Sequence, residues 1–323
     1  MAINQWIYRV SKPLGGLSLA KFLTRKHPKI LMYHRIGNEL GRINVDEFRT
    51  QLKIIKKYFN PIALNDLVEI SRYGNIPDNC VVITFDDGYY DFGELAFPLL
   101  KEECVPATLF LTTGFVDGNV WLWPDKLKYV LNNTDLKNVE IEGFDFDLVS
   151  KFDNHEAWNL IADYCLTLPD YKKTLLIESL FHKLEVVLPD SIPKSQSAVN
   201  WEKVNEFISN GIEIGSHSVT HPVLKNVDEK QLTYEVVNSK SRIFDMTGYE
   251  VQGFCYPNGM PEDFDERVEY AVRAAGYQYA ISAYPGINPL NNRWAINRYP
   301  AQSNLENFEK NLYGFTRLNM KNK

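Results

Sequence analysis

Apolar residues along the chain occur in short continuous runs, separated by longer stretches in which they recur at helical spacing. The runs are rich in β-branched and aromatic residues, and about four to eight such residues in succession predict a buried strand. Six strands are expected, at residues 29–33, 80–85, 107–111, 212–214, 251–256 and 278–283. A seventh is expected near 60–64 or 293–298.

Between the strands, the apolar residues follow the period of an amphipathic helix. Phe48, Leu52, Ile55 and Phe59 lie on one face of a helix that Asp46 is expected to cap. Further helices are expected over 92–103, over 228–244 after the cap Asp228, and over 262–275 before Gly276. Because strands and helices alternate, the class is α/β with a parallel sheet, and 323 residues suit a barrel of strand and helix units.

The alternation stops between about residues 117 and 200. A connection of this length must contain its own helices or form an insertion that covers the substrate. Four tryptophans lie in or beside it, and tryptophan stacks on sugar rings as readily as it fills a core. Trp121 and Trp123 follow a strand end directly and are expected at the cleft.

Composition narrows the class of protein. Apolar residues make up 45% of the chain, and 35 basic against 41 acidic residues give a net charge of −6. This balance describes a folded globular protein and argues against nucleic acid as a partner. The four cysteines, at 80, 104, 165 and 255, lie in apolar or strand-like contexts and show no close pairing, so buried free thiols are expected, which favours a reducing compartment.

Residues 1–28 form an extension before the first strand, and residues 29–323 form the main domain with its insertion. The apolar runs of the extension are short, because Arg9, Lys12, Pro13 and Lys21 interrupt them. We therefore expect neither a signal peptide nor a membrane span, and we expect the protein to be cytoplasmic. The apolar residues of the extension, set among basic ones, predict either peripheral contact with the inner face of the membrane or packing across the domain.

Two carboxylates, Asp86 and Asp87, end the strand at 80–85 and are followed by Gly88. Adjacent carboxylates repel, so both stay ionised only when a cation lies between them or when one takes up a proton. The same three residues are also ordinary turn chemistry. The acidic pair alone leaves both interpretations open.

His217 and His221 follow the short strand at 212–214. Two histidines four apart share one face of a helix, and such pairs commonly bind Zn²⁺. Together with the acidic strand end, they predict a metal site of two histidines and one aspartate, with coordination left open for water.

Three segments together resemble the motifs of the NodB-like polysaccharide deacetylases of carbohydrate esterase family four. They are Thr-Phe-Asp-Asp-Gly at 84–88, His-Ser-Val-Thr-His at 217–221 and Phe-Cys-Tyr-Pro-Asn-Gly at 254–259. The resemblance implies a distorted (β/α) barrel of about seven parallel strands with a long, partly helical insertion.

The resemblance also implies roles for single residues. Asp86 would be the general base, and the backbone N–H of Tyr256 would bind the oxyanion. Asp87, His217 and His221 would hold one divalent metal ion, Zn²⁺ in the first instance, with Co²⁺, Ni²⁺ and Fe²⁺ as alternatives.

Two departures from the family pattern lead to further candidates. Many members carry the catalytic acid in a late Leu-x-His motif, but no histidine follows Gly259 here, and residues 31–34 resemble that motif in circularly permuted relatives. His34 is therefore the expected general acid, lying across the metal from Asp86. Many members also have arginine where this chain has Cys255. Arg298 is the candidate to orient Asp86 in its place, and it is grouped with Trp121 and Trp123 as a residue facing the substrate.

The function that the resemblance implies is metal-dependent removal of acetyl from an N-acetylated sugar, releasing acetate. The sugar would belong to a surface polysaccharide, a lipid-linked saccharide or a related glycan. Two alternatives remain: hydrolysis of an O-acetyl ester or small amide on the same scaffold, and saccharide binding without turnover.

Overall fold

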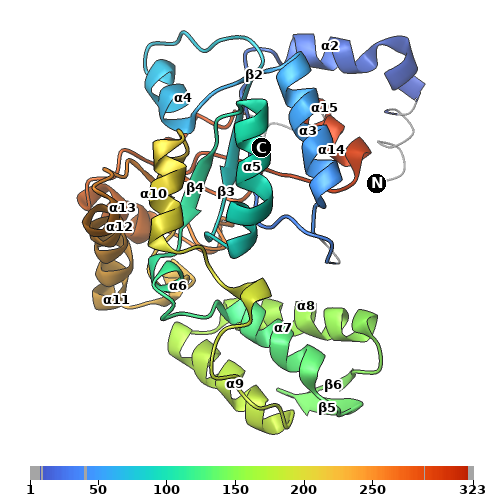
Figure 1. Cartoon of the computed structure of the whole chain (residues 1–323), viewed down its shortest axis with the longest axis vertical. Coiled ribbons are helices and arrows are strands. Elements are labelled where there is room, and N and C mark those ends of the chain that lie inside the picture. Colours follow the sequence, from blue (N-terminus) through green and yellow to red (C-terminus); the bar gives the residue numbers. More distant parts are fainter. Residues whose placement is uncertain (1–7, 9, 40–41, 287, 319–323) are drawn as a thin grey trace.

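A computed structural model describes residues 8, 10–39, 42–286 and 288–318 (Figure 1). Its centre is a sheet of eight strands in which every pair of neighbours is parallel, in the order β10-β1-β3-β4-β7-β8-β9, with β2 beside β3. The strands are β1 (Lys29–Tyr33), β2 (Asn60–Pro61), β3 (Cys80–Phe85), β4 (Thr108–Leu111), β7 (Glu213–Ser216), β8 (Gly253–Cys255), β9 (Tyr279–Ile281) and β10 (Tyr299–Pro300). The predicted parallel α/β class is confirmed.

The sheet closes into an irregular barrel through one short segment. Ile296 forms a parallel bridge with Ile281 of β9, and β10, three residues later, pairs with Leu31 and Met32 of β1. Residues 296–300 therefore join the last strand to the first. The expected distorted barrel is confirmed. Both ranges suggested for a seventh strand contribute to it: 60–64 contains β2, and 293–298 contains the start of this closing segment.

Helices cover the outside of the barrel. They are α3 (Val45–Tyr58), α4 (Leu64–Ser71), α5 (Phe97–Glu103), α10 (Trp201–Ser209), α11 (Glu229–Thr233), α12 (Ser239–Thr247), α13 (Glu266–Ala274), α14 (Leu305–Leu312) and α15 (Phe315–Leu318). Single π-helical turns, η2 (Phe92–Ala96) and η5 (Tyr234–Asn238), precede α5 and α12, and the 3₁₀ turn η4 (Leu224–Asn226) precedes α11. All six residues of β3 are buried, because one side of the strand packs under the outer helices and the other packs against neighbouring strands inside the barrel, which explains its continuous apolar run.

Two helix starts differ from the prediction. Asn44, and not Asp46, caps α3, because its side chain accepts from the Glu47 N–H while the Glu47 carboxylate accepts from the Asn44 N–H. Helix α13 begins at Glu266, four residues later than expected, where the Asp265 side chain supplies the cap.

The insertion follows β4 and contains its own helices and a hairpin, at the bottom of Figure 1. Its elements are α6 (Thr113–Val116), α7 (Trp123–Asn133), β5 (Asn138–Ile141), β6 (Phe144–Asp147), α8 (Lys151–Thr167), α9 (Asp170–Lys183) and η3 (Lys194–Gln196). Leu127, Ile161 and Leu180 belong to a cluster of buried apolar residues inside it, separate from the barrel core. The carboxyl end of β4 leads directly into this part of the chain, and Tyr89, which follows β3, donates to Asp125 of α7.

The N-terminal helix α2 (Gly16–Leu23), preceded by the 3₁₀ turn η1 (Lys12–Leu14), lies at the opposite end of the barrel, at the top of Figure 1. Trp6, Ile7 and Arg9 of the expected interfacial segment lie outside the described residues. In the described part of the chain, every helix is too short or too polar to cross a bilayer.

Candidate metal and catalytic site

The acidic turn after β3 separates its two carboxylates. Asp87 and Gly88 have φ of 74° and 87°, so two successive residues take the left-handed conformation. Glycine is needed at 88, since a Cβ there would lie 2.8 Å from a side-chain carbon of Leu111. Asp86 and Asp87 are 2% and 5% exposed, and each faces its own set of partners.

The two histidines lie on a loop, so the prediction that they share a helix is wrong. His217 follows β7 directly, and Ser218 and His221 have φ of 67° and 60°, which no right-handed helix contains. The rings nevertheless meet, with centroids 4.8 Å apart. The loop conformation, and not a helical repeat, brings the two imidazoles together.

Glu235 holds this loop in place. Its side chain is completely buried, and Oε2 accepts hydrogen bonds of 2.8 Å from the backbone N–H groups of Val219 and Thr220. The hydroxyl of Thr220 donates to Oε1. Sequence reasoning missed Glu235, because a glutamate inside a helical segment carries no local sign that it will be buried.

Asp87, His217 and His221 converge on one point. Oδ1 of Asp87 lies 3.5 Å from Nε2 of His217 and 3.4 Å from Nε2 of His221, and it is buried without a hydrogen-bond partner among the described residues. Ligand atoms about 2.0–2.1 Å from a tetrahedral ion are about 3.3–3.4 Å apart, so the three atoms fit a divalent cation.

Burial shifts the pKa values of Asp87, His217 and His221 toward their neutral forms. It lowers the pKa of His217 to about 4 and that of His221 well below its usual value, which keeps both imidazoles neutral, as metal ligands must be. Burial, reinforced by the neighbouring Asp86, raises the pKa of Asp87 well above its usual value. A cation between these atoms would favour the ionised carboxylate.

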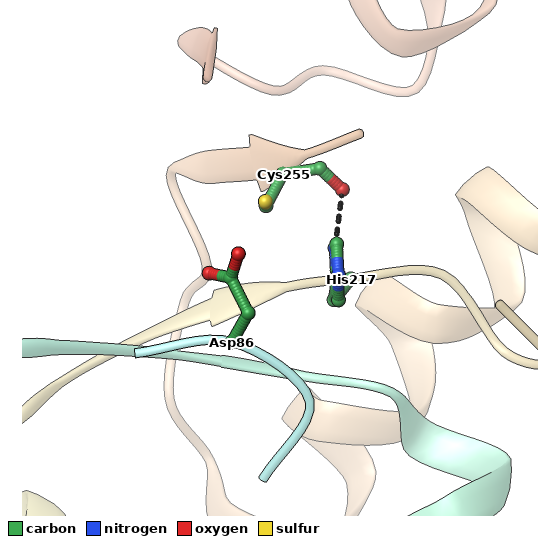
Figure 2. Close-up of side chains that lie close together, drawn as sticks. All are labelled: Asp86, His217 and Cys255. Atoms are coloured by element: carbon green, nitrogen blue, oxygen red, sulfur yellow. Dashed lines mark hydrogen bonds between the residues drawn. The ribbon is translucent and has the colours of Figure 1, made fainter. Parts of the chain in front are cut away.

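A second cluster, of Asp86, His217 and Cys255, lies alongside (Figure 2). His217 donates from Nδ1 to the backbone carbonyl of Cys255 at 2.8 Å, which leaves the Nε2 lone pair facing Asp87. The guanidinium of Arg298 already lies between the other two members, with Nη2 2.8 Å from Asp86 Oδ2 and 3.1 Å from Cys255 Sγ. The cluster around Asp87 is therefore the better metal site.

Arg298 forms a two-pronged ion pair with Asp86. Nη1 and Nη2 donate to Oδ1 and Oδ2 at 2.7 and 2.8 Å, and further bonds reach Thr84 and the carbonyl of Ser282. Burial alone would raise the pKa of Asp86, but the guanidinium holds it below its usual range. Arg298 has no exposed surface, so it lies behind the carboxylate and orients it without facing a substrate.

His34 follows β1 and lies beside Asp86. Its Nε2 is 3.7 Å from Oδ2 of Asp86, which is too close for the expected position across the metal. Half of its side chain, 49%, is exposed, so a group arriving from solvent can reach the ring. Desolvation lowers the pKa of His34 below its usual value, and the charge of Asp86 opposes that shift.

Tyr256 does not have the free backbone N–H that its expected role requires. That N–H donates to the carbonyl of Ile281 at 3.1 Å, and the phenol donates to the carbonyl of Trp294. Asn258, in the turn after β8, has φ of 60°, and within the described chain neither its backbone N–H nor its buried Nδ2 has an acceptor. The unpaired donors make Asn258 a better candidate than Tyr256 for binding an oxyanion.

The two expected aromatic contacts differ in exposure. Trp123 is only 9% exposed and packs in the core of the insertion. Trp121 is half-buried, packs edge to face on Tyr129, and lines a cavity of about 200 Å³ together with Thr220, the neighbour of His221. Trp123 also lines this cavity, but Trp121 is the more exposed of the pair and is the better candidate for substrate contact.

The insertion also reaches the acidic turn through Asp125 of α7. The hydroxyl of Tyr89, two residues after Asp87, donates to Asp125 Oδ2 at 2.8 Å. Arg35, next to His34, donates from Nε to Asp91 at 2.8 Å and stacks over the Tyr89 ring. These contacts tie the insertion to the residues around the site, and the sequence holds no spacing signal for them.

Comparisons with known proteins agree with the geometry. A family model described as polysaccharide deacetylase matches residues 73–158 and 181–280, more than half of the chain. The poly-β-1,6-N-acetyl-D-glucosamine N-deacetylase of Staphylococcus epidermidis is 25% identical over 181 residues, 52% of this chain and 58% of that one. YxkH of Bacillus subtilis is 22% identical over 80% of this chain and 64% of its own length. The chain thus spans about three fifths of these two relatives.

Solved structures show the same fold. The Streptococcus pyogenes deacetylase PplD in complex with acetate matches with a TM-score of 0.59 at 18% identity, over 90% of this chain and 97% of that one. IcaB from Ammonifex degensii matches with the same TM-score at 16% identity, over 89% and 97%. With the expected motifs in one matched domain and the barrel fold shared, the chain belongs to the polysaccharide deacetylase family.

Proposed function

We propose that the protein hydrolyses the acetamido group of an N-acetylated saccharide, releasing acetate and a free amine. One observation carries this proposal. Arg298 keeps Asp86 ionised, while Oδ1 of the adjacent Asp87 and the Nε2 atoms of two histidines converge on a position that suits one cation. A base and a cation site one residue apart suit hydrolysis by an activated water.

Asp87, His217 and His221 would hold a divalent ion. Their nitrogen and oxygen donors suit Zn²⁺. When bound, the ion would polarise the amide carbonyl and lower the pKa of a bound water. Asp86 takes the proton of the attacking water, since Arg298 holds it ionised and aligned. The N–H groups of Asn258 donate to the carbonyl oxygen as it becomes negative.

His34 completes the reaction by giving a proton to the departing nitrogen. An amine leaves poorly as an anion, so a proton donor is required. Desolvation lowers the pKa of His34, but the charge of Asp86 beside it favours the protonated imidazole that can donate. Its half-exposed ring next to the buried Asp86 lies where water and substrate enter. The circularly permuted origin of this residue stays a prediction.

The proposed substrate class is a polymer or oligomer of N-acetylhexosamine. The named staphylococcal relative acts on poly-β-1,6-N-acetyl-D-glucosamine, and the cavity beside Thr220, with Trp121 in its wall, offers an aromatic face near the metal site. β-1,6-linked N-acetylglucosamine oligomers are therefore the first substrate to test.

The experiment measures acetate and free amine from these oligomers, with the enzyme stripped of metal and then loaded with Zn²⁺. The D86N variant is the matched control, because it keeps the shape of the side chain and removes the base. Free amine formed by the native protein alone supports the proposal. Acetate from O-acetylated but not N-acetylated sugars would favour an esterase, and binding without product would favour a saccharide-binding protein.

A further inference from the structure

Helix α2 presents apolar side chains to solvent instead of to the core. Leu19, Phe22 and Leu23 are 59%, 58% and 54% exposed, and Leu14 in the preceding turn is 82% exposed. Residues at i, i+3 and i+4 share one face of a helix, so the three helical residues form one continuous surface. We name Leu14, Leu19, Phe22 and Leu23 the α2 apolar face.

The opposite side of α2 is fixed to the barrel, so this face cannot turn inward. Ala20 is 2% exposed and Thr24 is fully buried. The Thr24 hydroxyl donates to the carbonyl of Ala20 at 2.9 Å and lies within reach of the Tyr313 carbonyl. Lys21 donates to the carbonyl of Tyr58 at 3.1 Å. The exposed side chains are therefore held outward by packing.

The charge around the face is positive, although the protein as a whole is acidic. The first 28 residues contain five lysines and arginines and no aspartate or glutamate, whereas the whole chain carries −6. Lys12, Arg25 and Lys26 beside the face keep 44%, 37% and 65% of their side chains exposed. Two carboxylates face these cations: Glu309 pairs with Lys12, and Asp78 with Arg25 and Lys26.

We propose that the α2 apolar face docks on an anionic lipid surface. Outward leucine and phenylalanine side chains enter the boundary between head groups and acyl chains, and flanking lysine and arginine bind the head groups. A leaflet of neutral lipid would supply only the first interaction. The local excess of positive charge in an acidic protein favours an anionic membrane over a second copy of this chain.

The fold then sets the orientation of the active site. Helix α2 precedes β1, and His34 follows its other end, about 17 Å further along at roughly 3.3 Å per residue. Figure 1 shows α2 and the insertion at opposite ends of the molecule. The catalytic end of the barrel therefore points away from the membrane, toward a saccharide that extends from the surface.

The test uses the full chain, without substrate, on vesicles of phosphatidylcholine alone or with about 30% phosphatidylglycerol. Cosedimentation should show binding to the anionic vesicles that weakens as salt rises. The double variant L19S/F22S should bind at least about tenfold more weakly, and K26Q about fivefold more weakly. The matched control is F152S/L160S, which removes two side chains of α8 with similar exposure, 63% and 59%, at the other end of the molecule.

Circular dichroism should show that all variants remain folded, because the replaced side chains are exposed. Amide hydrogen exchange should slow at residues 14–23 on anionic vesicles and stay unchanged at 119–123 of the insertion. Equal binding to both kinds of vesicle, no binding at low salt, or equal loss in the control variant would overturn the proposal. Concentration-dependent dimerisation abolished by L19S/F22S would assign the face to a second copy.

Discussion

Replacing Arg298 by glutamine tests the central ion pair of the site. The guanidinium is fully buried and has four protein partners, so its loss leaves the Asp86 carboxylate buried without a counter-ion. Removing one partner of a buried pair costs about 3–5 kcal/mol. At roughly 2 °C per kcal/mol for a chain of this size, the melting temperature should fall by about 6–10 °C.

The pH dependence gives a second readout. In the native protein the pKa of Asp86 is lower in the folded state than in the unfolded state. The ion pair therefore stabilises the folded protein above about pH 4, and this stabilisation is lost as the pH falls. Without Arg298, burial dominates and raises the folded pKa. The variant should therefore lose stability relative to the native protein as pH rises from about 4, and its activity should require higher pH.

Two controls separate the ion pair from general damage. Arg273→Gln removes a half-exposed arginine that pairs with Glu269 and stacks over the Trp294 ring, and it should lower the free energy of unfolding by no more than about 1.5 kcal/mol. The double variant R298Q/D86N should regain part of the lost stability and none of the activity. An R298Q protein that kept native activity and a melting temperature within about 2 °C would refute the reasoning.

Three further variants test the roles of the other residues. His217→Ala should lose bound metal and activity together, measured by metal analysis and acetate release; a full equivalent of retained metal would show that the site is elsewhere. Asp86→Asn should keep its metal and lose about 10²–10⁴-fold in rate, whereas loss of metal would mean that the two aspartates have exchanged roles. His34→Ala should keep fold and metal and lose most activity on an amide but less on an activated ester, and normal amide hydrolysis would remove it from the mechanism.

The sequence alone determined the inner strands and the residues at their ends. Strands β1 and β3 have the predicted bounds, because a parallel strand buried on both faces must be apolar throughout and this leaves a continuous run. The sequence predicts that Asp87, His217 and His221 lie together, and they do. They follow the carboxyl ends of β3 and β7, and the carboxyl ends of parallel barrel strands lie at the same end of the barrel. The cytoplasmic location stays a prediction.

Only the tertiary structure decided the details of the site. The backbone of the loop at 217–221 depends on Glu235, which comes from a helix, and the Tyr256 N–H is taken by a neighbouring strand. The sequence named Arg298 as the candidate to orient Asp86, and the two side chains do pair, but the contact exists because an irregular segment far along the chain closes the barrel and carries the guanidinium inside. Such contacts depend on how distant segments pack, and no local spacing of residues encodes them.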